Sequence, residues 1–135
     1  MKIKLISTLV LSAIAATAFA MPPEPAGCPD PNDIKNVSVD LVQRDRDGSW
    51  AAGIMNNKFG TNDDWTFVIA KIKAANEDAA KSKAQDGMQS LSEPQGPIAV
   101  EQYNVWACLY QNDKGYPAAT VNPALGLSPM LNILK

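Results

Sequence analysis

The chain has 135 residues, of which 12 are basic and 14 acidic, so its formal net charge is −2. A mildly acidic chain lacks the basic surface that binds nucleic acid or an anionic membrane, so we expect neither partner. The sequence contains no histidine, which excludes a Ser-His-Asp or Cys-His catalytic arrangement and a zinc site made mainly of imidazole. The length suits one domain with one hydrophobic core.

Residues 1–20 have the pattern of a cleaved secretory signal peptide. Two lysines precede an apolar stretch from Leu5 to Ala16, and residues 18–20 (Ala-Phe-Ala) place small side chains where signal peptidase reads them. The apolar stretch is shorter than the roughly 20 residues that a membrane span needs. We therefore expect a mature chain from Met21 with no integral membrane segment, exported to the periplasm or out of the cell.

The two cysteines, Cys28 and Cys108, predict one disulfide in an exported chain. In the chain-entropy model, a bond closing a loop of this size stabilises the fold by roughly 4 kcal/mol. Two alternatives remain open: a pair of free buried thiols, or lipid attachment at Cys28, since Ala26 and Gly27 resemble the end of a lipoprotein signal. Pro25 stands where such signals carry an aliphatic residue, which favours the disulfide.

Residues 21–33 form a leader with five prolines, which block regular structure. One helical turn is expected at residues 34–37, then a strand around Val39 and Leu41. Further strands are predicted at residues 49–55 and 65–70, the last of them rich in aromatic and β-branched side chains. Aspartate and glycine within residues 44–48 favour a tight turn between the first two strands.

A helix is predicted to begin at Asn76, which suits an N-cap. Glu77 and Asp78 place negative charge in its first turn, where the helix dipole favours it. Small side chains on its apolar stripe would let it lie close to a sheet; the stripe comprises Ala80, Ala84, Met88 and Leu91. Pro94 and Pro97 then predict an exit loop.

The longest predicted strand covers Val100–Tyr110. Alternation along it puts Trp106, Cys108 and Tyr110 on one face, and the other face receives Tyr103, Val105, Ala107 and Leu109. Residues 112–115 (Asn-Asp-Lys-Gly) predict a hairpin turn, and residues 116–121 a returning strand. The apolar tail, residues 124–135, is expected to pack on the domain or on a partner.

This order of elements predicts an α+β domain at residues 34–123. We expect an antiparallel sheet of about five strands with one main α-helix packed on it and one disulfide. The strand order does not follow from the sequence.

Two carboxylate pairs are the remaining catalytic candidates, Asp45 with Asp47 and Asp63 with Asp64, because two carboxyl groups suffice for some hydrolases. Both pairs fall in predicted turns, where aspartate is common for backbone reasons, so we expect a protein that is not an enzyme. Asp45 also begins a weak match to a calcium loop, whose twelfth position, Asn56, lacks the required acid. We therefore expect no metal site.

The aromatic side chains allow two interpretations, the core of a small sheet domain or a flat platform for an apolar ligand. Trp106 and Tyr110 are the more ambiguous, because they share a strand face with Cys108. The candidate ligand-binding residues are Trp106, Tyr110, Tyr103 and Tyr116.

Four motifs in this order resemble a family of small exported proteins of unknown function from intracellular Gram-negative pathogens, some labelled hemin-binding protein. The motifs are Cys28-Pro29, Trp65-Thr66-Phe67, an alanine-rich helix near Ala79, and Trp106-Ala107-Cys108-Leu109-Tyr110. The resemblance covers most of residues 28–123 and implies hemin as a candidate ligand. Haem iron is usually held by histidine, thiolate, methionine or tyrosine, so the candidate axial ligands are Tyr103, Tyr110, Tyr116, Met55, Met88 and Met130. Binding by apolar contact alone is the other mode.

Two functional hypotheses follow. The first is a small exported, non-enzymatic protein of uncharacterised role that binds hemin or another apolar ligand on an aromatic sheet face. The second is a secreted interaction module, an inhibitor or host-facing factor, that docks a host or periplasmic protein through its apolar tail or a strand edge. A concave apolar pocket containing Trp106 or Tyr110 would favour the first, and a flat apolar patch or an uncovered edge strand the second.

Overall fold

The computed structural model describes residues 20–134, so nearly all of the predicted signal peptide lies outside the described residues. Six strands form one antiparallel sheet in the order β1-β2-β3-β6-β5-β4. The predicted α+β class is confirmed. The predictions of about five strands and one main helix are wrong in number, because the sheet has six strands and the described residues form three α-helices.

The first half of the sheet is a meander of β1 (Leu41–Arg44), β2 (Trp50–Asn57) and β3 (Trp65–Ile72). β3 lies inside the sheet, between β2 and β6, and its first six side chains are buried. Burial on both faces explains why this stretch is almost continuously apolar rather than alternating.

The long strand predicted for residues 100–110 is replaced by two strands. β4 (Gln95–Val100) and β5 (Val105–Tyr110) pair antiparallel, with the 3-10 turn η1 (Glu101–Tyr103) between them. Asn104 ends this turn in the left-handed conformation, with φ of 54°. Asparagine reaches that conformation more readily than most residues, so the chain can reverse there.

Pro94 and Pro97 predicted a loop, but Pro97 lies inside β4. β4 is at the edge of the sheet, and an edge strand tolerates proline because one side of it has no neighbour to which an N–H must donate. The loop prediction is therefore wrong at Pro97, because the position of β4 at the sheet edge makes proline compatible with a strand.

The returning strand β6 (Ala118–Asn122) inserts between β3 and β5. It follows the predicted hairpin turn, in which the Asn112 side chain accepts from Lys114 N and Tyr116 N and donates to Tyr116 O. The turn prediction is confirmed.

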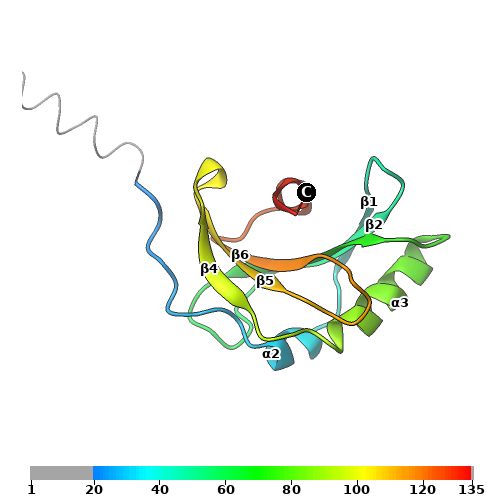
Figure 1. Cartoon of the computed structure of the whole chain (residues 1–135), viewed down its shortest axis with the longest axis horizontal. Helices are drawn as coiled ribbons and strands as arrows, with labels where there is room; N and C mark the ends of the chain where they lie inside the picture. Colours follow the sequence, from blue (N-terminus) through cyan, green and yellow to red (C-terminus); the bar gives the residue numbers. More distant parts are fainter. Residues whose placement is uncertain (1–19, 135) are drawn as a thin grey trace, which may run out of the picture.

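Two helices cover one face of the sheet, which we call the leader face because residues 21–30 also lie on it (Figure 1). α3 (Glu77–Met88) begins as predicted, with the Asn76 side chain accepting from Ala79 N at 2.9 Å. A Cβ at Gly87 would stand 3.0 Å from Ile69 Cδ1, so glycine lets this helix lie against the sheet.

α2 (Pro31–Lys35) starts three residues earlier than the turn predicted at 34–37. Asp30 caps it by accepting from Asn32 N at 2.8 Å, and proline suits the first helical position because its missing N–H would have no partner there. Ile34 is fully buried and anchors the helix to the leader-face core.

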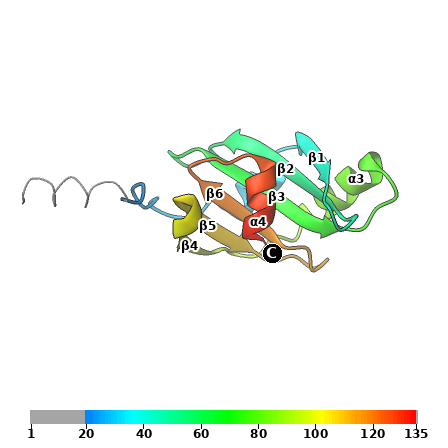
Figure 2. The ribbon, with the colours of Figure 1, turned by 90° about the horizontal axis from the view of Figure 1, so that it is seen from above.

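The apolar tail forms α4 (Leu127–Ile133) on the opposite face, which we call the α4 face (Figures 1 and 2). Its Leu127, Met130 and Leu131 are buried against inward side chains of the sheet. Thr66 Oγ1 donates to Leu125 O at 2.7 Å and fixes the chain just before the helix. The tail therefore packs on its own domain, which is one of the two placements expected.

The predicted disulfide is confirmed: Cys28 and Cys108 are bonded, 80 residues apart in sequence, and join the leader to β5. No helix within residues 20–134 combines the length and apolar character needed to cross a membrane.

Candidate functional site

Trp106, Cys108 and Tyr110 share one side of β5, as alternation predicts, and all three contact the leader. Trp106 Nε1 donates to Pro22 O at 3.0 Å, and Cys108 carries the disulfide to Cys28. The side of β5 that was predicted to bind a ligand therefore binds the protein's own leader.

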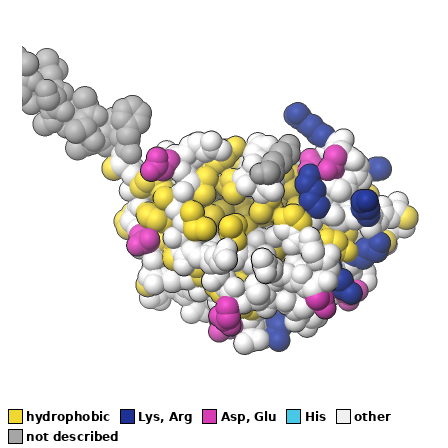
Figure 3. All heavy atoms as spheres, viewed as in Figure 1, with side chains coloured by type: hydrophobic (Ala, Val, Ile, Leu, Met, Phe, Trp, Pro, Cys, Tyr) yellow, Lys and Arg dark blue, Asp and Glu magenta, His cyan; other side chains and the backbone are white. Residues whose placement is uncertain are grey.

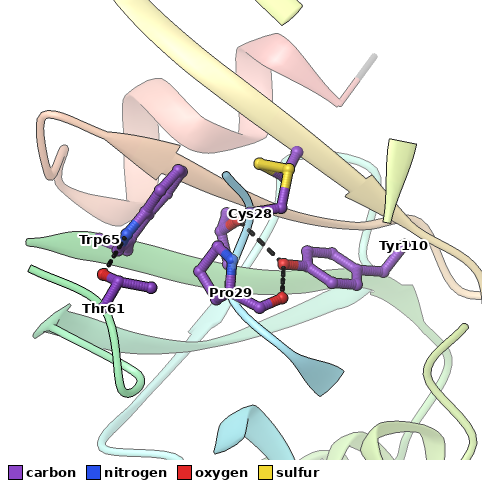
Figure 4. The surroundings of a disulfide bond; sticks show 7 residues. Cys28, Pro29, Thr61, Trp65 and Tyr110 are labelled. Atoms are coloured by element: carbon purple, nitrogen blue, oxygen red, sulfur yellow. Dashed lines mark hydrogen bonds between the residues drawn. A yellow bond between two sulfur atoms is a disulfide. The ribbon is translucent and has the colours of Figure 1, made fainter. Parts of the chain in front are cut away.

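Tyr110 is buried, with 3% of its surface exposed, and its hydroxyl donates to Pro29 O at 2.6 Å (Figure 4). Its ring meets Phe67 edge-on, with centroids 6.5 Å apart. Burial raises the pKa of the Tyr110 phenol well above its ordinary value, and a hydrogen bond with Thr120 opposes part of this rise. Tyr110 is thus a structural anchor for the leader.

The other two candidates lie elsewhere. Tyr103 ends η1 and is half-buried against the α4-face core, whereas Tyr116 is half-buried on the leader-face core beside Gly87. The four predicted ligand-binding residues are therefore not brought together in one site.

Several candidate axial ligands for haem iron are also buried and therefore inaccessible to a ligand at the surface. Met88 and Met130 are buried in the two cores, and the Tyr110 hydroxyl is already hydrogen-bonded. The three that remain half-buried come from separate elements: Met55 from β2, Tyr103 from η1 and Tyr116 from the β5–β6 connection.

Lys71 holds the carboxylate pair of the β1–β2 turn. Its Nζ lies 2.8 Å from Asp47 Oδ2 and 3.8 Å from Asp45 Oδ2. The Lys71 hydrogen bond, followed by those from Ser49, keeps the pKa of Asp47 well below its ordinary 3.8. A carboxyl that stays ionised is a poor general acid, and both carboxylates accept hydrogen bonds from residues of the turn, Asp45 from Arg46 N and Asp47 from Ser49.

In the second pair, the Asp64 carboxylate forms an ion pair with Lys58 at 3.0 Å, and the backbone of Asp63 hydrogen-bonds to Thr61 Oγ1. Within residues 20–134, no three or more histidine, cysteine, aspartate or glutamate side chains gather in a group able to hold a metal ion.

An apolar groove of about 500 Å³ opens on the α4 face, between the end of α4 and β5. Its apolar walls are Ile133 and Leu134 at the end of α4, Leu109 from β5, and Pro117 just before β6. Figure 3 shows hydrophobic side chains gathered on the surface between the C-terminal helix and β4.

The position of α4 leaves this groove open. The helix packs mainly over β2 and β3 rather than toward the β4 edge. Consequently Ile98 on β4 and Leu109 on β5 stay 44% and 37% exposed, although their register places them on the same face as buried Ala107. On the far side of the helix, Leu41 on β1 is 40% exposed.

The groove was not among the sites predicted from the sequence. Its lining includes Tyr110, but that hydroxyl faces the leader on the other side of the sheet. Two features of the sequence indicated the groove: the apolar tail, and the alternation along β5 that places Leu109 opposite Cys108. Both lie on the α4 face. The missing information was where the tail would dock.

No family model matches the chain, and no curated protein or solved structure gives a significant match. The similarity to exported hemin-binding-like proteins therefore stays a prediction from the motifs. The functional argument rests on the geometry of the groove.

Proposed function

We propose that this is a small exported, non-enzymatic protein that binds an apolar ligand in the groove between α4 and β5. The observation that carries this proposal is a concave apolar hollow of about 500 Å³. Small-molecule sites are typically apolar clefts of roughly 300–1,000 Å³ with a few polar groups at their rim. Export is supported by the disulfide, which persists in oxidising compartments.

Hemin is the ligand implied by the motif resemblance, and the groove supports it only in the apolar-contact mode. Among the residues lining the groove, Tyr110 alone is of a type that ligates haem iron, and its hydroxyl is bonded to Pro29 on the other face. The donor set therefore does not fit iron ligation in the groove, and we propose a ligand held by burial of its apolar surface.

A protein-docking role is favoured by a different observation. β4 is an edge strand, and Ile98 on it is exposed, so an extended segment could pair with the edge and cover this side chain. This docking proposal does not include the apolar tail, because the tail forms α4, which packs on its own sheet.

The test is a titration of the oxidised protein with a neutral fluorescent probe, N-phenyl-1-naphthylamine. We expect saturable one-to-one binding that Leu109→Gln weakens severalfold and Leu41→Gln leaves unchanged. The two leucines are equally exposed on the same face, but Leu41 is outside the groove. Non-saturating fluorescence, or equal effects of the two substitutions, would reject the groove and favour a protein partner.

Hemin is tested in the same assay as a competitor, with absorbance followed in the Soret region. Displacement of the probe that Leu109→Gln weakens would make hemin a ligand of the groove. A Soret change without displacement would place hemin outside it.

A further inference from the structure

Among residues 20–134, the polar rim of the groove carries charge of only one sign. It consists of Ser92, Glu93, Gln95 and Gln111, so Glu93 is the one charged side chain among the residues that line it. Ser92 and Gln111 form two hydrogen bonds with each other. Ser92 N donates to the backbone oxygen of Gln111, and Gln111 N donates to Ser92 Oγ. Glu93 is exposed at the surface.

The part of the sequence that contributes the groove residues has the same bias. From Ala84 to Lys135, two basic residues, Lys114 and Lys135, stand against four acidic residues, a net charge of −2, the acidic set being Asp86, Glu93, Glu101 and Asp113. Figure 3 shows the lysine and arginine side chains gathered mainly toward β1, β2 and α3, away from the apolar surface beside β4.

We infer that the groove selects a cationic amphiphile, a molecule with an apolar body and a positively charged head, over an anionic one of the same body. The apolar body lies against Leu109, Pro117 and the end of α4, and the head lies at Glu93. This inference rests on the proposed function, because it assumes that the groove is the binding site. It also disfavours ligands that carry carboxylates, including the propionates of hemin.

The expected size of the selectivity follows from the exposure of Glu93. An exposed charge pair changes an affinity by about threefold, so attraction of a cation and repulsion of an anion together give a preference of about tenfold at low ionic strength. Screening should reduce this preference as salt is added, since the Debye length falls from about 30 Å at 0.01 M to about 3 Å at 1 M.

The experiment displaces N-phenyl-1-naphthylamine from the oxidised protein with three compounds that share one alkyl chain: dodecyltrimethylammonium, dodecanol and dodecanoate. All three are used below their micelle concentrations, at neutral pH and low salt. We expect the cation to bind about tenfold more tightly than the carboxylate, with the alcohol between them.

Glu93→Gln should remove this order while leaving dodecanol binding unchanged. Glu101→Gln removes the same charge from the same half of the chain but outside the groove, and should leave the order nearly intact. Lys135, which follows the groove residue Leu134 in sequence, lies outside the described residues, so Lys135→Gln is included and should not reverse the order.

The outcomes separate the two proposals. Equal affinities for the three compounds, with Leu109→Gln still weakening all of them, would overturn the charge selection and leave the groove as a binding site. An order that survives Glu93→Gln would overturn the role of Glu93. Failure of the probe and of every compound to bind would overturn the proposed function and this inference with it.

Discussion

At Tyr110, ring and hydroxyl have different partners. The ring packs against Phe67 in the core, and the hydroxyl reaches the leader at Pro29 O. A residue proposed from the sequence as a ligand-binding aromatic therefore holds the leader to β5 and the core. Alternation along β5 identified the right neighbours for Tyr110 but could not reveal that the leader fills the space in front of it.

Tyr110→Phe should destabilise the protein by about 1–3 kcal/mol, because it leaves the buried carbonyl of Pro29 without its donor. Urea unfolding of the oxidised protein measures the loss. Tyr116→Phe is the matched control, since the hydrogen bonds of Tyr116 within residues 20–134 come from its backbone. Equal losses in the two variants would contradict this role of the Tyr110 hydroxyl.

Alkaline pH should also weaken the fold through Tyr110. Burial raises its pKa in the folded state above the ordinary 10.0, so the folded phenol keeps its proton at a pH where the unfolded chain has lost it. Unfolding then releases a proton, and stability that is fully present below pH 10 declines as the pH rises further.

Urea midpoints measured at neutral pH and above pH 10 test this dependence. The decline should be smaller in Tyr110→Phe, which has no phenol to ionise at this position. An identical decline in both proteins would assign the alkaline sensitivity to other groups.

At the scale of the elements, α4 packs on β2 through a close contact that no sequence pattern predicted. It docks where Gly53 of β2 leaves room: a Cβ there would stand 3.1 Å from Phe67 O and 3.3 Å from Leu127 Cδ1. The nearest atom, Met55 Cε at 2.5 Å, belongs to a flexible side chain and can move, whereas the backbone oxygen cannot.

Gly53→Ala should therefore cost about 1–3 kcal/mol by overpacking the contact between α4 and the sheet. Gly27→Ala serves as the control, because nothing lies within 4 Å of the added atom. Thermal or urea unfolding distinguishes them, and the prediction is wrong if Gly53→Ala is as stable as the control.

Elements whose signals are local were predictable from the sequence, and those set by sheet position were not. β3 and the Asn76 cap of α3 follow from composition and capping chemistry within a few residues. The break between β4 and β5 depends on a single left-handed Asn104, and β4 itself contains a proline that only an edge strand accepts. The groove depends on where α4 docks, which no local pattern encodes.

For the whole molecule, the sheet lies between the two ends of the described chain. The leader covers one face together with α2 and α3, and α4 covers the middle of the other (Figure 1). Within residues 20–134, the one covalent cross-link besides the backbone is the bond between Cys28 and Cys108, which ties the leader to the sheet.

Replacing both Cys28 and Cys108 by alanine should lower the free energy of unfolding by about 4 kcal/mol, because the unfolded chain loses its constraint. Urea unfolding compares the variant with the oxidised protein. Adding a reductant should destabilise the parent protein similarly and leave the variant unaffected. A variant as stable as the oxidised parent would show that the bond contributes no net stability.

Export predicts a defined N-terminus. Full-length protein expressed in a Gram-negative bacterium should be recovered starting at Met21, as read by N-terminal sequencing and intact mass, with no lipid on Cys28. Ala20→Leu should accumulate as the uncleaved precursor, because signal peptidase requires a small residue before the cut. Recovery of the parent protein from Met1, or of a lipid-modified form, would contradict this assignment.

The link between leader and β5 also sets an order of events during synthesis. A chain that emerges N-terminus first presents Cys28 80 residues before Cys108. Over that interval the thiol has no correct partner, and Pro22 and Pro29 lack the β5 side chains that will bind them. The leader, although made before every strand, is therefore among the last segments to reach its place, and any oxidant or thiol that meets the unfinished chain competes with its native pairing.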